Sequence, residues 1–177
     1  MNRRKIRYIG GLCILLMFGL IFFFATQISR LQNIKEEKDR MMDYLPEFCG
    51  DDILGEQQCI HQNSDRVTIL VFFGTKCKRC EDEINGFYKN RSNLEDVRII
   101  LLSSESIENC TDFFVTHKLF ELPNLYILRD TSGHIMRNSG ISGVPATFLY
   151  DKDKRLVKRF EGEVKTETLL EYIEAIK

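Results

Sequence analysis

The feature that most constrains the fold is a short apolar segment that is followed at once by two cysteines. Residues 67–73 are apolar apart from one threonine, rich in β-branched and aromatic residues, and end at Gly74, which predicts a fully buried strand. Cys77 and Cys80 follow, spaced so that both fall in the first turn of a helix that starts there. The sequence therefore predicts a buried strand that leads directly into a helix with a cysteine pair at its N-terminus.

The position of these cysteines favours a reactive thiol. A helix N-terminus carries unpaired N–H groups and a partial positive charge, which stabilise a thiolate and lower the pKa of the thiol. Three basic residues lie within two positions of Cys77 and should tune its redox chemistry in the same direction. They are Lys76, Lys78 and Arg79. A purely structural disulfide is the alternative, but the short charged segment between the cysteines favours reactivity.

Composition limits the other functions that the chain could have. Its 177 residues and formal net charge of -1 fit one domain with a short appendage and argue against binding to nucleic acid. The sequence has no glycine-rich phosphate loop, no H-E-x-x-H and no G-x-S-x-G motif. We therefore expect no cofactor and no metal ion.

The N-terminus has the pattern of a membrane anchor. Residues 1–7 contain four basic residues and no acid, and residues 8–26 form a run of 19 residues without a charge. As a helix, such a run would span roughly 30 Å, about one hydrocarbon core. Because the basic flank should stay in the cytoplasm, the rest of the chain is expected outside it. A cleaved signal peptide is the alternative, although no clear cleavage site follows the run.

The next segments are expected to connect this anchor to the domain. Residues 27–45 are charged, with apolar residues at three- to four-residue steps, which predicts a helical stalk; a short dimeric coiled coil is the alternative. Residues 46–66 are polar and predict a loop at the start of an extracytoplasmic domain over residues 46–177.

Two further cysteines lie in this polar segment. Cys49 and Cys59 are ten residues apart, and outside the cytoplasm a disulfide between them is chemically permitted. Alternatively, they stay unpaired or have separate partners. Zinc binding together with Cys77 and Cys80 would require that pair to leave its strand-to-helix setting, so it is the least favoured alternative.

Beyond the cysteine pair, the pattern alternates between strands and helices. Strands are expected over residues 97–102, 125–128, 143–150 and 155–160, and helices over 79–91, from Ser106 or Asn109 onward, and from Thr166 onward. The order β-α-β-α-β-β-α predicts an α/β fold with a central mixed sheet flanked by helices.

Two segments together resemble the active-site regions of TlpA/ResA-type thioredoxins. One is residues 72–83, Phe-Phe-Gly-Thr-Lys-Cys-Lys-Arg-Cys-Glu-Asp-Glu, and the other is residues 140–151, Gly-Ile-Ser-Gly-Val-Pro-Ala-Thr-Phe-Leu-Tyr-Asp. The resemblance covers about residues 67–177 and implies a thioredoxin-like fold. Members of that family are membrane-anchored, extracytoplasmic thiol–disulfide oxidoreductases.

The resemblance implies roles for five residues. Cys77 would be the exposed attacking thiolate and Cys80 the resolving thiol. Glu83 falls where the family often keeps an acid near the cysteine pair; its alternative is a solvated helix residue. Val144 and Pro145 would be joined by a cis peptide bond that faces the disulfide and keeps a substrate's backbone in reach. The alternative is an ordinary trans proline.

The chain departs from the family pattern at three positions. Lys76 replaces the usual Trp before the first cysteine, Arg79 replaces the usual Pro between the cysteines, and Val71 lies where cytoplasmic thioredoxins bury an aspartate. These changes leave the exchange chemistry possible but leave the redox potential and the partner open.

The resulting hypothesis is an extracytoplasmic thiol–disulfide oxidoreductase that reduces protein disulfides through a Cys77/Cys80 couple. Its expected partners are protein thiol and disulfide substrates and a membrane-embedded electron donor or acceptor. The cations near Cys77 favour an oxidant, whereas the family resemblance favours a reductant. A non-catalytic binding module of the same fold and a copper-delivery protein are the alternatives. A peroxiredoxin would need P-x-x-x-T-x-x-C, but Leu70 and Gly74 occupy the Pro and Thr positions.

Overall fold

The structure is a computed structural model. It describes the backbone of residues 3–61 and 65–176, and the side chains in these ranges except those of residues 3–15 and 34–39. The chain divides into two compact units, one ending at Lys38 and the other beginning at Asp39.

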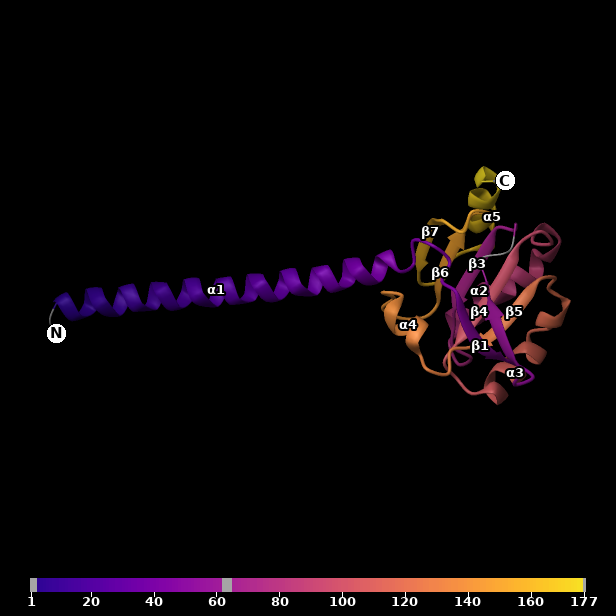
Figure 1. Cartoon of the computed structure of the whole chain (residues 1–177), viewed down its shortest axis with the longest axis horizontal. Coiled ribbons are helices and arrows are strands. Elements are labelled where there is room, and N and C mark those ends of the chain that lie inside the picture. Colours follow the sequence, from indigo (N-terminus) through magenta and orange to yellow (C-terminus); the bar gives the residue numbers. More distant parts are fainter. Residues whose placement is uncertain (1–2, 62–64, 177) are drawn as a thin grey trace. The chain divides into compact units, whose positions relative to one another are not determined.

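The N-terminal unit is helical. Helix α1 (Arg3–Arg40) is continuous, so no break separates the expected span over residues 8–26 from the expected stalk over 27–45 (Figure 1). Within the described part of the chain, no helix is both long enough and apolar enough to cross a membrane. The transmembrane helix is therefore not confirmed. The basic flank over residues 1–7 and the first part of the run, residues 8–15, have side chains outside the description.

The second unit is built on a seven-stranded mixed sheet with the strand order β2-β1-β5-β4-β3-β6-β7 (Figure 1). The strands are β1 (Phe48–Asp52), β2 (Gln57–Ile60), β3 (Thr68–Phe72), β4 (Arg98–Ser103), β5 (Leu125–Arg129), β6 (Ala146–Tyr150) and β7 (Leu156–Glu161). The three strands β3, β4 and β5 are parallel, and the other pairings are antiparallel. The strand expected to be fully buried, β3, is buried at all five positions.

Helices pack on the sheet and enclose two apolar cores. The helices are α2 (Lys78–Lys89), α3 (Ile107–Thr116), α4 (His134–Asn138) and α5 (Thr166–Ile176), with short 3-10 helices η1 (Arg91–Asn93) and η2 (Leu119–Glu121). Successive side chains of β3 point to opposite faces of the sheet and therefore pack alternately in one core and in the other. Ile69 packs with Ile84 and Phe87 of α2, whereas Leu70 packs with Phe148. The predicted α/β fold with a central mixed sheet is confirmed.

The loop predicted over residues 46–66 is wrong, because this segment contains the hairpin β1–β2. Cys49 lies directly opposite Cys59 in the hairpin, and the two form a disulfide. The sequence does not indicate these strands, because they are short and their polar and apolar residues lack the alternation that marks a half-buried strand.

The domain also begins earlier than residue 46. Met42 and Leu45 are buried in one of the two cores of the sheet. The backbone of this segment is hydrogen-bonded to the connection between β6 and β7, since the N–H of Leu45 donates to the carbonyl of Lys154 at 2.9 Å. The last residues of the expected stalk therefore belong to the folded unit.

Candidate functional site

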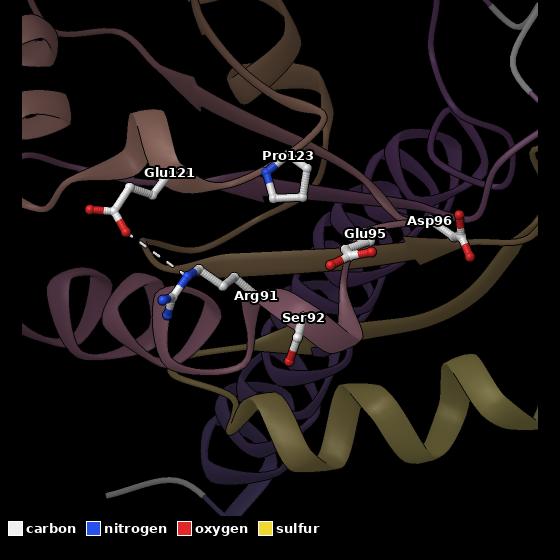
Figure 2. Close-up of a pocket in the computed structure, with 6 residues that line it drawn as sticks. All are labelled: Arg91, Ser92, Glu95, Asp96, Glu121 and Pro123. Atoms are coloured by element: carbon white, nitrogen blue, oxygen red, sulfur yellow. Dashed lines mark ion pairs between the residues drawn. The ribbon is translucent and has the colours of Figure 1, made fainter.

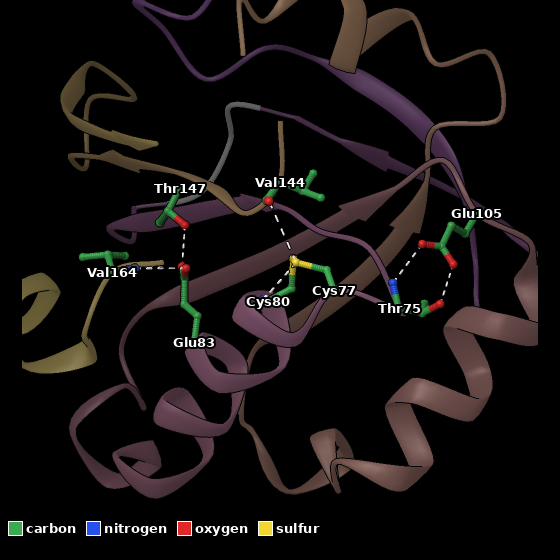
Figure 3. Close-up of a disulfide and its surroundings, with 8 residues drawn as sticks. All are labelled: Thr75, Cys77, Cys80, Glu83, Glu105, Val144, Thr147 and Val164. Atoms are coloured by element: carbon green, nitrogen blue, oxygen red, sulfur yellow. Dashed lines mark hydrogen bonds between the residues drawn. A yellow bond between two sulfur atoms is a disulfide. The ribbon is translucent and has the colours of Figure 1, made fainter. Parts of the chain in front are cut away.

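The cysteine pair lies where β3 leads into α2, as the sequence predicts. Cys77 is the N-cap residue of α2 and has an extended backbone, with φ −99° and ψ 107°. Its Sγ accepts a hydrogen bond from the N–H of Cys80 at 3.2 Å, and the two cysteines form a disulfide (Figure 3). Cys80 is fully buried, whereas Cys77 is half-buried. Cys77 is therefore the sulfur that an incoming group can reach.

The second segment of the family resemblance lies against this disulfide. The carbonyl oxygen of Val144 is 3.8 Å from the Sγ of Cys77, across 67 residues of sequence (Figure 3). The peptide bond between Val144 and Pro145 is cis. The carbonyl of Pro145 accepts a hydrogen bond from the N–H of Gly162 at 2.9 Å, which ties the segment to the end of β7.

Glu83 lies one turn after Cys80 on the same face of α2 and is only 2% exposed. Its Oε1 accepts a hydrogen bond from the hydroxyl of Thr147, and its Oε2 accepts one from the N–H of Val164 at 3.2 Å (Figure 3). Burial raises the pKa of Glu83 to about 7, although both hydrogen bonds oppose the shift. The solvated alternative is thus wrong, and this carboxyl can exchange a proton near neutral pH.

The basic residues around the pair are exposed, and at least one of them is paired. Lys78 forms ion pairs with Glu81 at 3.3 Å and Asp82 at 2.9 Å, both on its own helix. Lys76 and Arg79 are also exposed. Because two acids offset the charge of Lys78, that residue adds less positive potential at the cysteines than its position in the sequence suggests.

One acid at the site is not indicated by any sequence pattern. The carboxylate of Glu105 accepts a hydrogen bond from the backbone N–H of Thr75 at 2.9 Å and a second one from the Thr75 hydroxyl (Figure 3). Thr75 is two residues before Cys77, but Glu105 is 30 residues from Thr75 along the chain. Only the parallel pairing of β3 with β4 brings the two together. The contact of Thr147 with Glu83 is likewise not indicated by the sequence, because it joins β6 to α2 across 64 residues.

Four of the described cysteines form two separate disulfides, an arrangement that does not match the alternative of one zinc site shared by these four residues. Cys49 pairs with Cys59 on the edge hairpin, and Cys77 pairs with Cys80. Cys110 is buried as a free thiol, and burial raises its pKa. Among the described residues, no cluster of three or more His, Cys, Asp or Glu side chains is placed to hold a metal ion.

The structure also has a polar pocket of about 680 Å³ (Figure 2). It is lined by Arg91, Ser92, Glu95, Asp96, Glu121 and Pro123. Asp96 comes just before β4 and Pro123 just before β5, whereas Cys77 follows the end of β3. Since these strands are parallel, the pocket lies at the opposite edge of the sheet and is not part of the cysteine site.

Comparisons with known proteins agree with this geometry. The model of the AhpC/TSA family matches residues 41–159. The chain is 30% identical over 145 residues to the thiol-disulfide oxidoreductase ResA of Bacillus thuringiensis subsp. konkukian, covering 80% of this chain and 82% of that protein. A search of solved structures finds StoA from Bacillus subtilis, with a TM-score of 0.55, 24% identity and coverage of 72% of this chain and 96% of StoA.

A second solved structure is similar in fold. It is a secreted disulfide oxidoreductase of Mycobacterium tuberculosis, homologous to DsbE of E. coli, with a TM-score of 0.63 and 16% identity. The match covers 77% of this chain and 98% of that protein. At such identities the two structural matches speak to the fold alone, which is thioredoxin-like.

Proposed function

This chain belongs to the AhpC/TSA family and, within it, to the ResA-type thioredoxin-like thiol–disulfide oxidoreductases, and we propose from that premise that Cys77 and Cys80 form its redox couple. The observation that carries the assignment is the place of Cys77. It caps α2, is half-buried, and has its Sγ on the N–H of Cys80. A thiolate formed there keeps that hydrogen bond and faces the positive end of the helix dipole.

The reaction that we propose is the reduction of a protein disulfide, the direction that the family resemblance favours. The Cys77 thiolate attacks one sulfur of the substrate disulfide, and the other substrate sulfur leaves as a thiolate. The Cys80 thiolate then attacks the Sγ of Cys77, which breaks the mixed disulfide, releases the second substrate thiolate and closes the Cys77–Cys80 bond. Two electrons thus pass from the protein to its substrate.

Glu83 supports the second step of this reaction. Buried Cys80 attacks only after its thiol has lost a proton, and a general base works best when its pKa is near the working pH. Glu83 lies on the same face of α2, and its pKa is raised to about 7. We therefore assign it the role of proton acceptor for Cys80, directly or through a water molecule.

The segment before β6 supports substrate binding. The Val144 carbonyl, 3.8 Å from the Sγ of Cys77, puts a backbone acceptor next to the atom that forms the mixed disulfide. An extended substrate segment can pair with Val144 and Pro145 through main-chain hydrogen bonds, which accept many side chains. This binding mode suits an enzyme that acts on protein disulfides.

We also propose that the protein lies outside the cytoplasm and is attached to the membrane by its N-terminal segment. This placement rests on the uncharged run over residues 8–26 and its basic flank. From Leu16 to Phe24, every large apolar side chain of α1 is more than half exposed. The disulfide of the edge hairpin suits an oxidising compartment. There, a membrane-embedded electron donor would return the Cys77/Cys80 pair to the dithiol.

A stoichiometric exchange assay tests this proposal against the alternative of a binding module. The reduced full-length protein is mixed with a peptide that contains one disulfide, and free peptide thiols are counted by mass spectrometry. We expect one peptide disulfide to be reduced per protein molecule, with the Cys77–Cys80 disulfide formed in step. Cys77→Ser should abolish the reaction, whereas Cys110→Ser should leave it unchanged. Peptide binding without reduction would contradict the proposal.

A further inference from the structure

The turn that leads into α2 is held from outside by Glu105. Residues 74–77 form a tight turn in which the N–H of Cys77 donates to the carbonyl of Gly74 at 3.3 Å. Thr75 lies within this turn, and the Glu105 carboxylate accepts hydrogen bonds from both its N–H and its hydroxyl (Figure 3). Both donors of Thr75 are thus bound by one side chain.

Glu105 is itself well placed to hold this turn. It comes two residues after the end of β4, a strand that lies between β3 and β5 in the sheet. Its N–H donates to the hydroxyl of buried Ser103 at 3.2 Å, and α3 begins directly afterwards, with Ser106 as its N-cap. A strand on one side and a capped helix on the other fix the backbone from which the carboxylate reaches Thr75.

The surroundings of Gly74 show that Glu105, Val144 and Cys77 lie close together. A Cβ at Gly74 would lie 3.1 Å from Oε1 of Glu105, 3.6 Å from Cγ2 of Val144 and 3.7 Å from Cβ of Cys77. The Glu105 carboxylate is therefore in the immediate surroundings of the redox pair, although the hydrogen bonds that it accepts come from Thr75. Such an acid acts on Cys77 either through its charge or through the turn that it holds.

We propose that Glu105 is a positioning residue for thiol–disulfide exchange: it fixes the turn that places the Sγ of Cys77 on the N–H of Cys80. This inference rests on the proposed function of that pair. The negative charge of Glu105 alone would disfavour a thiolate at Cys77, so the two modes of action predict opposite effects when Glu105 is removed. The N–H of Cys80 contacts Sγ directly, at 3.2 Å, whereas the Glu105 carboxylate accepts hydrogen bonds from the turn at Thr75 and not from Cys77. The positioning effect should therefore dominate.

The test measures the pKa of the Cys77 thiol in the reduced full-length protein. Alkylation of Cys77 is followed by mass spectrometry from pH 4 to 10, so that the other cysteines do not interfere. In Glu105→Ala we expect the Cys77 pKa to rise by about one unit, which leaves about tenfold less thiolate at pH values below it. In Glu105→Gln, which keeps an acceptor for Thr75, the alkylation rate should stay within twofold of wild type.

The equilibrium with glutathione gives a second readout. Destabilising the thiolate destabilises the reduced protein, so a tenfold shift toward the disulfide is expected in Glu105→Ala. For this two-electron couple, a tenfold shift is about 30 mV toward a more negative potential. A loss of fold stability alone would not move the potential in this direction.

Two matched variants separate positioning from a general structural role. Thr75→Ala removes one of the two donors and should raise the Cys77 pKa in the same direction, whereas Thr75→Ser keeps the hydroxyl and should not. Added to Glu105→Ala, Thr75→Ala should have no further effect, because both changes break one interaction. Ser106→Ala removes the N-cap of α3. It should lower the melting temperature and leave the Cys77 pKa unchanged.

Several results would overturn the inference. One is a folded Glu105→Ala protein whose Cys77 pKa is unchanged or lower; another is a Glu105→Gln protein as impaired as Glu105→Ala. If Glu105→Ala does not fold, equal pKa values of the Cys77 thiol in Thr75→Ala and Thr75→Ser would overturn the inference instead. A wild-type protein that performs no exchange would overturn the proposed function, and this inference with it. Exchange-competent wild type with an insensitive Glu105→Ala would overturn only the inference.

Discussion

The hydroxyl of Thr147 donates a hydrogen bond to the carboxyl of Glu83, and both side chains are buried between β6 and α2. Thr147 comes two residues after Pro145, and Glu83 comes three residues after Cys80. This one contact joins the acid of the cysteine helix to the strand that starts beside the disulfide. The N–H of Val164, in the segment between β7 and α5, donates a second hydrogen bond to the Glu83 carboxyl.

The first prediction concerns stability and pH. The pKa of Glu83 is raised from 4.5 to about 7, so between these values the unfolded chain releases a proton that the folded protein keeps. The free energy of unfolding should therefore fall as the pH rises from about 4.5 to 7 and then level off. The contribution of this group is on the order of 3 kcal/mol. Urea unfolding of the oxidised protein at pH 5 to 8 measures it.

Glu83→Gln should lack this part of the pH dependence, because an amide does not titrate. Glu171→Gln, on the exposed side of α5, serves as the matched control and should keep the wild-type slope. If Glu83→Gln and wild type lose stability in parallel between pH 5 and 7, Glu83 does not titrate in this range.

The second prediction concerns the role of Glu83 in the exchange. In wild type, the release of a reduced peptide from the mixed disulfide should slow as the pH falls below about 7, where Glu83 becomes protonated. In Glu83→Gln the release should be slower by roughly a hundredfold at pH 8, the lower range for a lost general base. Stopped-flow single turnovers give the rate. Alkylation of Cys77 should not change, and an unaltered release rate would remove Glu83 from the mechanism.

The third prediction uses Thr147 to shift that pH dependence. Its hydrogen bond lowers the pKa of Glu83 against the effect of burial. In Thr147→Val, which keeps the shape but loses the hydroxyl, the pKa of Glu83 should rise further. The inflection in the rate of peptide release should then move to higher pH, while the limiting rate above it stays similar. An inflection that stays in place would show that another group controls the profile.

The fourth prediction concerns the disulfide of the edge hairpin. Because Cys49 and Cys59 are ten residues apart, replacing both by Ser should cost about 3 kcal/mol of stability on the chain-entropy model. The exchange rate at Cys77 should stay within twofold of wild type, since β1 and β2 lie at the far edge of the sheet from β3. Urea unfolding and the peptide assay measure the two effects. A large loss of exchange would instead give this disulfide a part in the chemistry.

The fifth prediction concerns topology. If the segment over residues 8–26 anchors the protein with the domain outside, protease added to intact spheroplasts of the host should digest the domain. A cytoplasmic marker protein in the same cells must stay intact as the control. Protection of the Cys77 peptide until the cells are lysed would contradict this placement.

The parts of the structure that could be predicted from the sequence are those with a strong local signal. The apolar run of β3 and the cysteines directly after it indicate a buried strand and a helix that starts at the cysteine pair, and the structure has both. The hairpin β1–β2 lacks such a signal, because its short strands are stabilised by the pairing of β1 with β5 and by a disulfide.

The residues of the site could likewise be predicted only where they lie in a local sequence motif. Cys77, Cys80, Glu83, Val144 and Pro145 lie in two motifs, and the structure brings these motifs together. Glu105 and Thr147 were not predictable, because each acts on a partner that is 30 or more residues away in the sequence. The burial of Glu83 also depends on Val164 and Thr147, so its raised pKa could not be deduced from α2 alone.

The most direct measurement of the central claim is the identity of the cysteine that joins the substrate. With Cys80→Ser the second step cannot occur, so the mixed disulfide with a peptide substrate should accumulate. Non-reducing digestion and mass spectrometry should then find the peptide on Cys77, and Cys77→Ser should trap little or none through buried Cys80. A peptide trapped equally on Cys80, or on Cys110 or the hairpin cysteines, would contradict the assignment of Cys77 as the attacking thiolate.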